Sequence, residues 1–167
     1  MLDEDGQALY ALLSRLTLRQ DVAEDLMQDL FANLCRSQGF QRCPNPAAYA
    51  RQAAIHLAFN WRRSQRRSRQ MPMPESDPPA EQPLPLARLI QAEQAGQVLD
   101  ALEELSEQSR DIVVMRFIEG QSYDQIAHHL GRSVHQTRAL CHKGIQRLRQ
   151  MLGKEGGATC CTLSGRS

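Results

Sequence analysis

The sequence lacks any apolar run near the roughly 20 residues that a membrane-spanning helix needs. Its first ten residues, MLDEDGQALY, are acidic and lack the basic start and apolar core of a signal peptide. The five cysteines are odd in number and match no common disulfide framework. These absences predict a reduced, cytoplasmic protein that does not insert into a membrane.

Signs of catalysis are also missing. We find no glycine-rich phosphate loop, no carboxylates clustered at catalytic spacing and no nucleophile motif. The sequence therefore predicts no enzyme, no catalytic residue and no cofactor. A metal or redox sensor is an alternative, although its candidate ligands show no common zinc spacing, so we predict no metal site. These candidates are His128, His129, His135, Cys141, His142, Cys160 and Cys161.

The charge of the 167 residues nearly cancels, at a net +1, but it is unevenly distributed. Residues 1–34 are mostly acidic, and residues 51–69 carry six arginines and no acid. Residues 75–107 are acidic again, and residues 132–149 are basic without an acid. Two alternations from acid to base indicate two modules, each with a positive face that attracts nucleic-acid phosphates.

The hydrophobic pattern predicts helices throughout. One helix is expected over residues 8–16, and a second follows Asp21, a candidate N-cap with Glu24 three residues on. A third begins at Asn45-Pro46, a capping residue followed by proline at the first helical position. Its expected inner face has helical spacing and consists of Ala50, Ala53, Ala54, Leu57, Ala58 and Trp61.

A proline-rich acidic segment, MPMPESDPPAEQPLP, separates the modules at residues 71–85. Repeated proline disfavours helix and leaves little to bury, so this segment reads as a flexible linker. We predict an all-α protein with a first domain at 1–70, a linker at 71–86, a second domain at 87–152 and a disordered tail at 153–167. The second domain is expected to hold helices near 87–105, 106–119, 122–130 and 133–152.

The end of the second domain carries a helix-turn-helix pattern. Ser122 with Gln125, and Ser133 with Gln136, are capping-box pairs that start two helices on either side of a turn at Gly131. Thr137, Cys141, Ile145 and Leu148 form the inner face of the second helix. Its outward residues offer donors, acceptors and one small apolar contact to base edges in a major groove. The residues predicted to contact DNA here are Arg132, Ser133, His135, Gln136, Arg138, Ala139, His142 and Lys143.

Three motifs in this order resemble the extracytoplasmic-function (ECF) group of bacterial sigma factors. AEDLMQDLF at 23–31 resembles the region 2 motif that meets the β′ clamp helices of RNA polymerase. NPAAYARQAAIHLAFNWRR at 45–63 resembles the helix that opens and reads the −10 promoter element. Residues 102–131 resemble region 4, which reads the −35 element and binds the β flap.

The resemblance implies a transcription initiation factor that binds core RNA polymerase and promoter DNA, with an anti-sigma factor as a further partner to test for. The clamp contact would use Glu24, Asp25, Gln28, Asp29 and Asn33. The −10 contact and strand melting would use Arg51, His56, Asn60, Arg62, Arg63, Arg66 and Arg67. The loop at 39–47 and Trp61 are further candidates for holding unpaired bases.

Several alternatives stay open on the sequence alone. A stand-alone helix-turn-helix regulator would explain the second domain but leave the motifs of the first domain without a role. Trp61 lies on an apolar stripe, so it is at least as suited to anchoring the core as to stacking on a base. The acids of the linker fit a solvated tether and a nucleic-acid mimic equally well.

Overall fold

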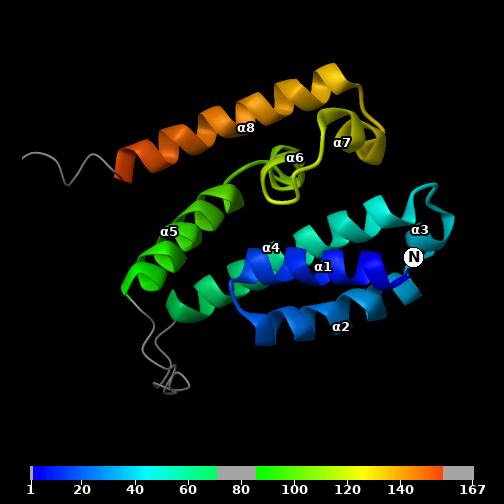
Figure 1. Ribbon diagram of the computed structural model, residues 1–167, viewed down its shortest axis with the longest axis horizontal. Helices are drawn as coiled ribbons and strands as arrows, with labels where there is room; N and C mark the ends of the chain where they lie inside the picture. Colours follow the sequence, from blue (N-terminus) through cyan, green and yellow to red (C-terminus); the bar gives the residue numbers. More distant parts are fainter. Residues whose placement is uncertain (1, 71–85, 156–167) are drawn as a thin grey trace, which may run out of the picture.

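The computed structural model describes residues 2–70 and 86–155, and side chains are described for 5–68 and 90–153. In these ranges the chain is helical and forms two modules packed on each other (Figure 1). The first module holds α1 (Leu2–Thr17), α2 (Gln20–Arg36), α3 (Gln38–Arg42) and α4 (Pro46–Gln70). The second holds α5 (Leu86–Glu103), α6 (Glu107–Phe117), α7 (Tyr123–Leu130) and α8 (Val134–Glu155). The predicted all-α, two-module fold is confirmed.

The predicted linker and tail lie mostly outside the described residues, at 71–85 and 156–167. Leu86, which we assigned to the linker, is the first residue of α5. Residues 153–155, which we assigned to the tail, form the last turn of α8. None of the described helices combines the length and the apolarity that spanning a lipid bilayer requires.

The core of the first module forms where α1, α2 and α4 pack together. Apolar side chains at helical spacing on each of the three helices meet there and leave water, which is the main driving force for folding. The fully buried members include Leu13, Leu16, Ala23, Leu30, Ile55 and Phe59.

Two helix starts test the capping predictions. Asn45 caps α4 as expected, since its Oδ1 accepts a hydrogen bond from the Ala48 amide at 3.1 Å. The prediction for Asp21 was wrong, because α2 begins at Gln20 and Asp21 lies inside its first turn. Its carboxylate pairs with Arg19, and Leu18 makes the preceding turn with a left-handed φ of 60°.

The second module is built around a close crossing of α6 and α8. Gly144 of α8 is buried, and a Cβ at this position would lie only 3.0 Å from Val113 Cγ2 of α6. The absent side chain therefore lets the two helices approach. The buried side chains around this crossing include Ile112, Val114, Met115, Ile126, Cys141 and Leu148.

The helix-turn-helix has the predicted caps and turn. Ser122 Oγ accepts from the Gln125 amide at 3.2 Å, and the Ser122 amide donates to Gln125 Oε1 at 2.8 Å. Ser133 and Gln136 exchange the same pair of bonds at 3.2 and 3.3 Å. Gly131 has a φ of 61°, in the left-handed region that favours glycine, and its amide bonds back to the end of α7.

Candidate nucleic-acid interface

The first half of α8 presents a polar face to solvent. His135, Gln136, Arg138, Ala139, His142 and Lys143 are all exposed, as is Ser133 just before the helix, while Arg132 is half-buried. Thr137 and Cys141 point the other way and are buried against the module. The face therefore offers several hydrogen-bond donors on a rigid helix, which suits reading of base edges in a major groove.

The capping bonds restrict two of these candidates. Ser133 Oγ and Gln136 Oε1 each accept one hydrogen bond within the turn, so the cap limits the directions in which either side chain can reach a base. Gln136 keeps its amide NH₂ as a donor. We expect positioning of the backbone to be the main task of Ser133.

Arg138 is held over an aromatic ring. Its guanidinium carbon lies 5.5 Å from the centroid of Tyr123, and that of Arg116 lies 5.0 Å from the same centroid. The Tyr123 hydroxyl in turn donates to Cys141 Sγ at 3.6 Å. Such cation–π contacts at exposed sites are worth about 0.5–1 kcal/mol, so the charge is partly ordered before any ligand arrives.

The basic residues predicted for the −10 contact lie mostly along the side of α4 that faces the second module. Arg51 lies 3.3 Å from Glu119, and His56 Nε2 lies 3.2 Å from Asp111. Asn60 and Arg67 lie on solvent-exposed positions of the same helix. Sequence reasoning grouped these residues correctly on one helix but did not anticipate that acids of the second module would face them.

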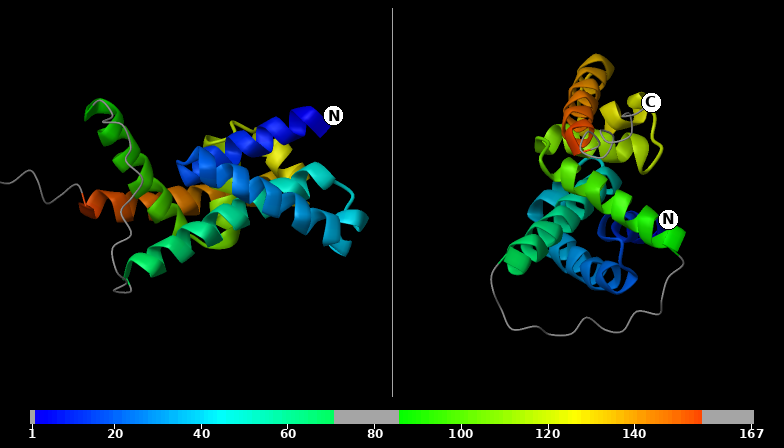
Figure 2. Two further views of the ribbon diagram at one scale, coloured as in Figure 1. Left: turned by 90° about the horizontal axis from the view of Figure 1, so that it is seen from below. Right: turned by 90° about the vertical axis from the view of Figure 1, so that its left-hand side faces the viewer.

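The other end of α4 makes a denser set of ion pairs. Arg62 and Arg66 each place Nη2 2.7 Å from Asp100 Oδ1. Arg66 also lies 3.0 Å from Glu103, and Arg63 lies 3.8 Å from it. The only sequence signal for these ion pairs is that the basic segment at residues 51–69 is followed by an acidic segment at residues 75–107. Figure 2 shows α5 running across the junction of the modules, where these contacts form.

The ion pairs alter several pKa values. The hydrogen bond to Asp111 raises the pKa of the His56 imidazole above its ordinary value. Burial works to raise the pKa of Asp100, but hydrogen bonds from Arg66 and Arg62 outweigh it and hold the pKa below its ordinary value. Burial raises the pKa of Glu119, against the opposing charge of Arg51. Protonation is thus tied to the contact between the modules.

The outer face of α2 is polar and exposed. All five residues predicted to meet the polymerase clamp have solvent-exposed side chains: Glu24, Asp25, Gln28, Asp29 and Asn33. The opposite face, with Leu26 and Leu30, is buried against α1 and α4. A helix that is anchored along one side and acidic along the other suits docking onto a basic partner surface.

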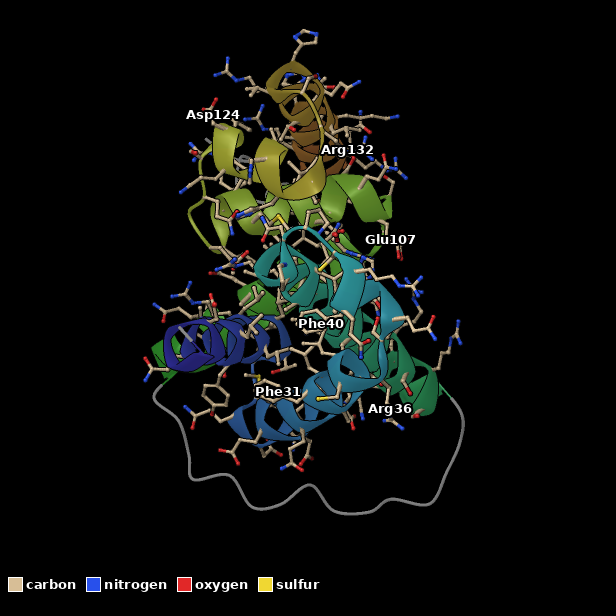
Figure 3. The ribbon with its side chains drawn as sticks, turned by 90° about the vertical axis from the view of Figure 1, so that its right-hand side faces the viewer. Phe31, Arg36, Phe40, Glu107, Asp124 and Arg132 are labelled. Carbon is tan, nitrogen blue, oxygen red and sulfur yellow. The ribbon has the colours of Figure 1, made fainter. Side chains whose placement is uncertain are left out.

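An apolar cavity of about 320 Å³ lies at the N-terminal end of α4 and was not anticipated. Leu9, Phe31, Leu34, Phe40 and Pro46 are among its lining residues. Phe31, on α2, is 46% exposed. The predicted loop at 39–47 is also partly helical, since α3 occupies its first part. Figure 3 shows Phe31 and Phe40 in the first module, far from Asp124 and Arg132.

Among the residues with placed side chains, no group of three or more His, Cys, Asp or Glu residues lies close enough to hold a metal ion. Cys141 is buried on the inner face of α8, as predicted. Thr137 is also buried there, and its hydroxyl donates to the Ser133 carbonyl at 3.0 Å. Cys160 and Cys161 lie outside the described residues.

Two protein-family models match the chain in the order that the fold suggests. The model of sigma-70 region 2 matches residues 1–68, and the model of sigma-70 region 4 matches residues 101–150. The first match covers α1 to α4, and the second covers the end of α5 through most of α8.

Three curated relatives are similar to this chain over most of its length. The ECF RNA polymerase sigma factor SigE of Mycolicibacterium smegmatis is 29% identical over 95% of this chain, which spans only 63% of that protein. The ECF RNA polymerase sigma factor SigX of Bacillus subtilis is 26% identical over 90% of this chain and 80% of its own length. The RNA polymerase sigma factor CarQ of Myxococcus xanthus is 30% identical over 87% of this chain and 83% of its own length.

Among solved structures, the sigma factor RpoE in complex with the anti-sigma factor NepR from Bartonella quintana aligns with a TM-score of 0.48. It is 22% identical, and the alignment covers 91% of this chain and 94% of that one. With both sigma-70 regions matched in order and relatives of this similarity, the chain belongs to the ECF family of RNA polymerase sigma factors.

Proposed function

We propose that this chain directs core RNA polymerase to promoters, recognising −35 and −10 elements and promoting strand opening without catalysing a covalent step. The observation that carries the proposal is the exposed, donor-rich face of α8, which follows a fully capped turn. It lies in the same chain as a basic helix and an acidic docking helix. Membership of the sigma-factor family supports assigning these three surfaces to duplex DNA, melted DNA and polymerase.

The second module would bind the −35 duplex. Base edges would be read from Arg138, His142 and Lys143, because these exposed side chains project from the half of α8 that follows the turn. Arg132, Arg147 and Arg149 are suited to phosphate contacts, which fix the register of the helix but carry no sequence information. The same module would rest on the polymerase β flap.

The first module would bind the clamp and the −10 region. The acidic side of α2 would meet the β′ clamp helices, and the cationic side chains of α4 would follow the backbone of the separating strand. Opening would be favoured because captured bases leave the stacked duplex, so free energy of binding offsets the cost of unpairing. His56, Asn60 and Trp61 are the nearest groups for such capture.

Joint binding of both modules to one polymerase would raise their effective concentration on a promoter. Each interface can then be weak alone and still be selective in combination. The place of action would be the cytoplasm, and an anti-sigma factor would be a further partner that competes for one of these surfaces.

The direct test is reconstitution of the full chain with core RNA polymerase on a library of promoter sequences, followed by mapping of transcript starts. We expect transcription that depends on this chain and a recurrent pair of upstream elements. If the chain never associates with core enzyme but binds a specific operator by itself, the stand-alone regulator is the better description.

The clamp contact has its own test in Asp29→Lys. This exposed residue of α2 should tolerate the change, so helicity by circular dichroism stays constant while affinity for core enzyme falls by about tenfold or more. Glu93→Lys is the matched control, because Glu93 is exposed on α5 in the other module. Equal core affinity of the two variants would remove α2 from the docking surface.

A further inference from the structure

Acidic side chains of the second module form a row along α5 and α6 and just beyond α6, here called the acidic row. Its members are Asp100, Glu103, Glu104, Glu107, Asp111 and Glu119. Each lies within 4.0 Å of a basic side chain of α4. The facing basic row consists of Arg51, His56, Arg62, Arg63 and Arg66. All five members of the basic row belong to the residues proposed above to hold the melted −10 strand.

The two rows meet over the whole length of the junction. At one end Arg66 approaches both Asp100 and Glu103, at 2.7 and 3.0 Å. At the other end Arg51 approaches Glu119 at 3.3 Å, and near it Arg15 of α1 donates to the Ile118 carbonyl at 2.7 Å. Figure 3 shows Glu107 at the level where the second module meets the first. Carboxylates thus face the same α4 side chains that, on the proposed function, would face phosphates of the −10 strand.

Apolar side chains of the two modules also belong to one continuous buried cluster, and Arg110 lies over the Phe59 ring. The ion pairs beside this apolar contact contain charges whose burial is only partly compensated. Neither carboxylate oxygen of Glu103 accepts a hydrogen bond from the described protein, although its side chain is 4% exposed. Asp111 Oδ1 and Arg62 Nε are also buried and have no hydrogen-bond partner among the described residues. Buried ion pairs with incomplete hydrogen bonding add little net stability, because desolvation offsets most of the attraction. Such a contact can hold the modules together and still yield to a stronger polyanion.

We propose that the acidic row is an internal competitor for the single-stranded DNA site on α4, so that the free chain is closed and must open before it can hold the −10 strand. The inference rests on the proposed function and adds a regulation of the same site. The competition is selective. The polar face of α8 and the acidic face of α2 are both exposed in the closed arrangement, so duplex DNA and polymerase remain able to bind.

The test removes charge from the acidic row while keeping the shape of the side chains, in the full-length variant Asp100→Asn with Glu103→Gln. The control is Glu93→Gln with Asp124→Asn, which removes two exposed acids of the same module that make no ion pair with α4 among the described residues. Two readouts report opening without DNA: the radius of gyration from X-ray scattering and the emission of Trp61, the single tryptophan. Trp61 lines a cavity with Gly96 and Asp100, so opening exposes it to water.

At low salt we expect the double variant to be larger than the wild type, with red-shifted Trp61 emission. It should bind a labelled single-stranded oligonucleotide on the order of fivefold more tightly, since several ion pairs of modest strength no longer compete. High salt should expand the wild type in the same way, because screening weakens the contact. The control should match the wild type in all three measurements.

The proposal is overturned if the double variant keeps the dimensions and emission of the wild type, or if it opens without a gain in oligonucleotide affinity. Should the double variant lose helicity, Asp100→Asn alone carries the test, because that side chain is 52% exposed and tolerates substitution. Failure of the proposed function is separate and visible elsewhere: the wild type would then not associate with core polymerase, whatever the scattering data show.

Discussion

Arg138 is the residue on which −35 discrimination should depend most. It projects from the exposed face of α8, and Tyr123 partly orders its guanidinium. A bidentate arginine contact to a base edge discriminates by about 1–3 kcal/mol. We therefore expect Arg138→Ala to weaken promoter binding and to relax the preference at one −35 position, measured by holoenzyme binding to a library of variant elements.

Arg147→Ala provides the comparison for Arg138, since it removes the same charge from an exposed position nearer the C-terminal end of α8. A phosphate contact affects all sequences alike, so this variant should lose affinity uniformly and reduce the salt dependence of binding. If both variants showed the same unaltered −35 preference, Arg138 would be a phosphate contact and not a reader of bases.

We predict that His56 makes the contact between the two modules sensitive to pH. Its imidazole faces Asp111, Glu107 and Arg110 of α6, and the cavity beside it is also lined by Gln52 and Arg132. The pKa of His56 is raised in the closed arrangement, so protons favour closure. This contribution is complete below the ordinary pKa of 6.5 and is lost as pH rises through the raised value.

His129 acts in the opposite direction, because burial and the nearby charges of Arg51 and His128 lower its pKa. The effect of His56 must therefore be isolated with His56→Gln. We expect Trp61 emission of the wild type to change more than that of the variant between about pH 6 and pH 8, with greater opening at the higher pH. Parallel pH profiles of the two proteins would show that His56 does not control closure.

Gly144 sets the distance between α6 and α8. A β-branched side chain there would overlap Val113 and Ser109, both buried on α6. We expect Gly144→Val to lower the free energy of unfolding by about 1–3 kcal/mol, measured by chemical denaturation. The same substitution at Gly153 of α8, where a Cβ would meet nothing within 4 Å, should change stability by less than about 0.5 kcal/mol. Equal effects at both sites would mean that α6 and α8 move apart to accommodate the valine, and that Gly144 does not set their distance.

The sequence predicted local helix chemistry well. The two capping boxes and the turn at Gly131 were predictable because every partner lies within a few residues of the other. The inner face of α4 was predicted less well, since Ile55 and Phe59 are fully buried and lie off the expected stripe. Arg110 of the second module lies 4.7 Å from the centroid of Phe59, so α4 is covered from two sides. A single helical stripe cannot reveal a second covered side.

The contact between the modules could not be predicted in the same way. The alternation of acidic and basic segments indicated two modules with positive faces, and that reading of residues 51–69 agrees with the position of these arginines on α4. It gave no reason to pair Arg62 with Asp100 or His56 with Asp111. These partners are 38 and 55 residues apart, and no local periodicity links them.

The ion pairs of the junction should couple the unfolding of the two modules more strongly when salt is low. At about 1 M salt the Debye length falls to about 3 Å, which screens partly exposed pairs. Loss of about 1 kcal/mol from the less stable module lowers its Tm by about 4–8 °C for a domain of this size. We expect calorimetry to show two thermal transitions that separate as salt is added. A constant separation, or the same salt response in the variant Asp100→Asn with Glu103→Gln, would contradict this coupling.

The position of α2 has a consequence for the order of events. This helix lies on the far side of the first module from α6 to α8 (Figure 1), and its acidic side chains are exposed to solvent. On the proposed docking through α2, core polymerase would engage the closed chain first, and release of the basic row of α4 would follow as a slower step. Stopped-flow traces of assembly should accordingly contain a rapid phase whose rate rises with enzyme concentration, and a later phase whose rate does not.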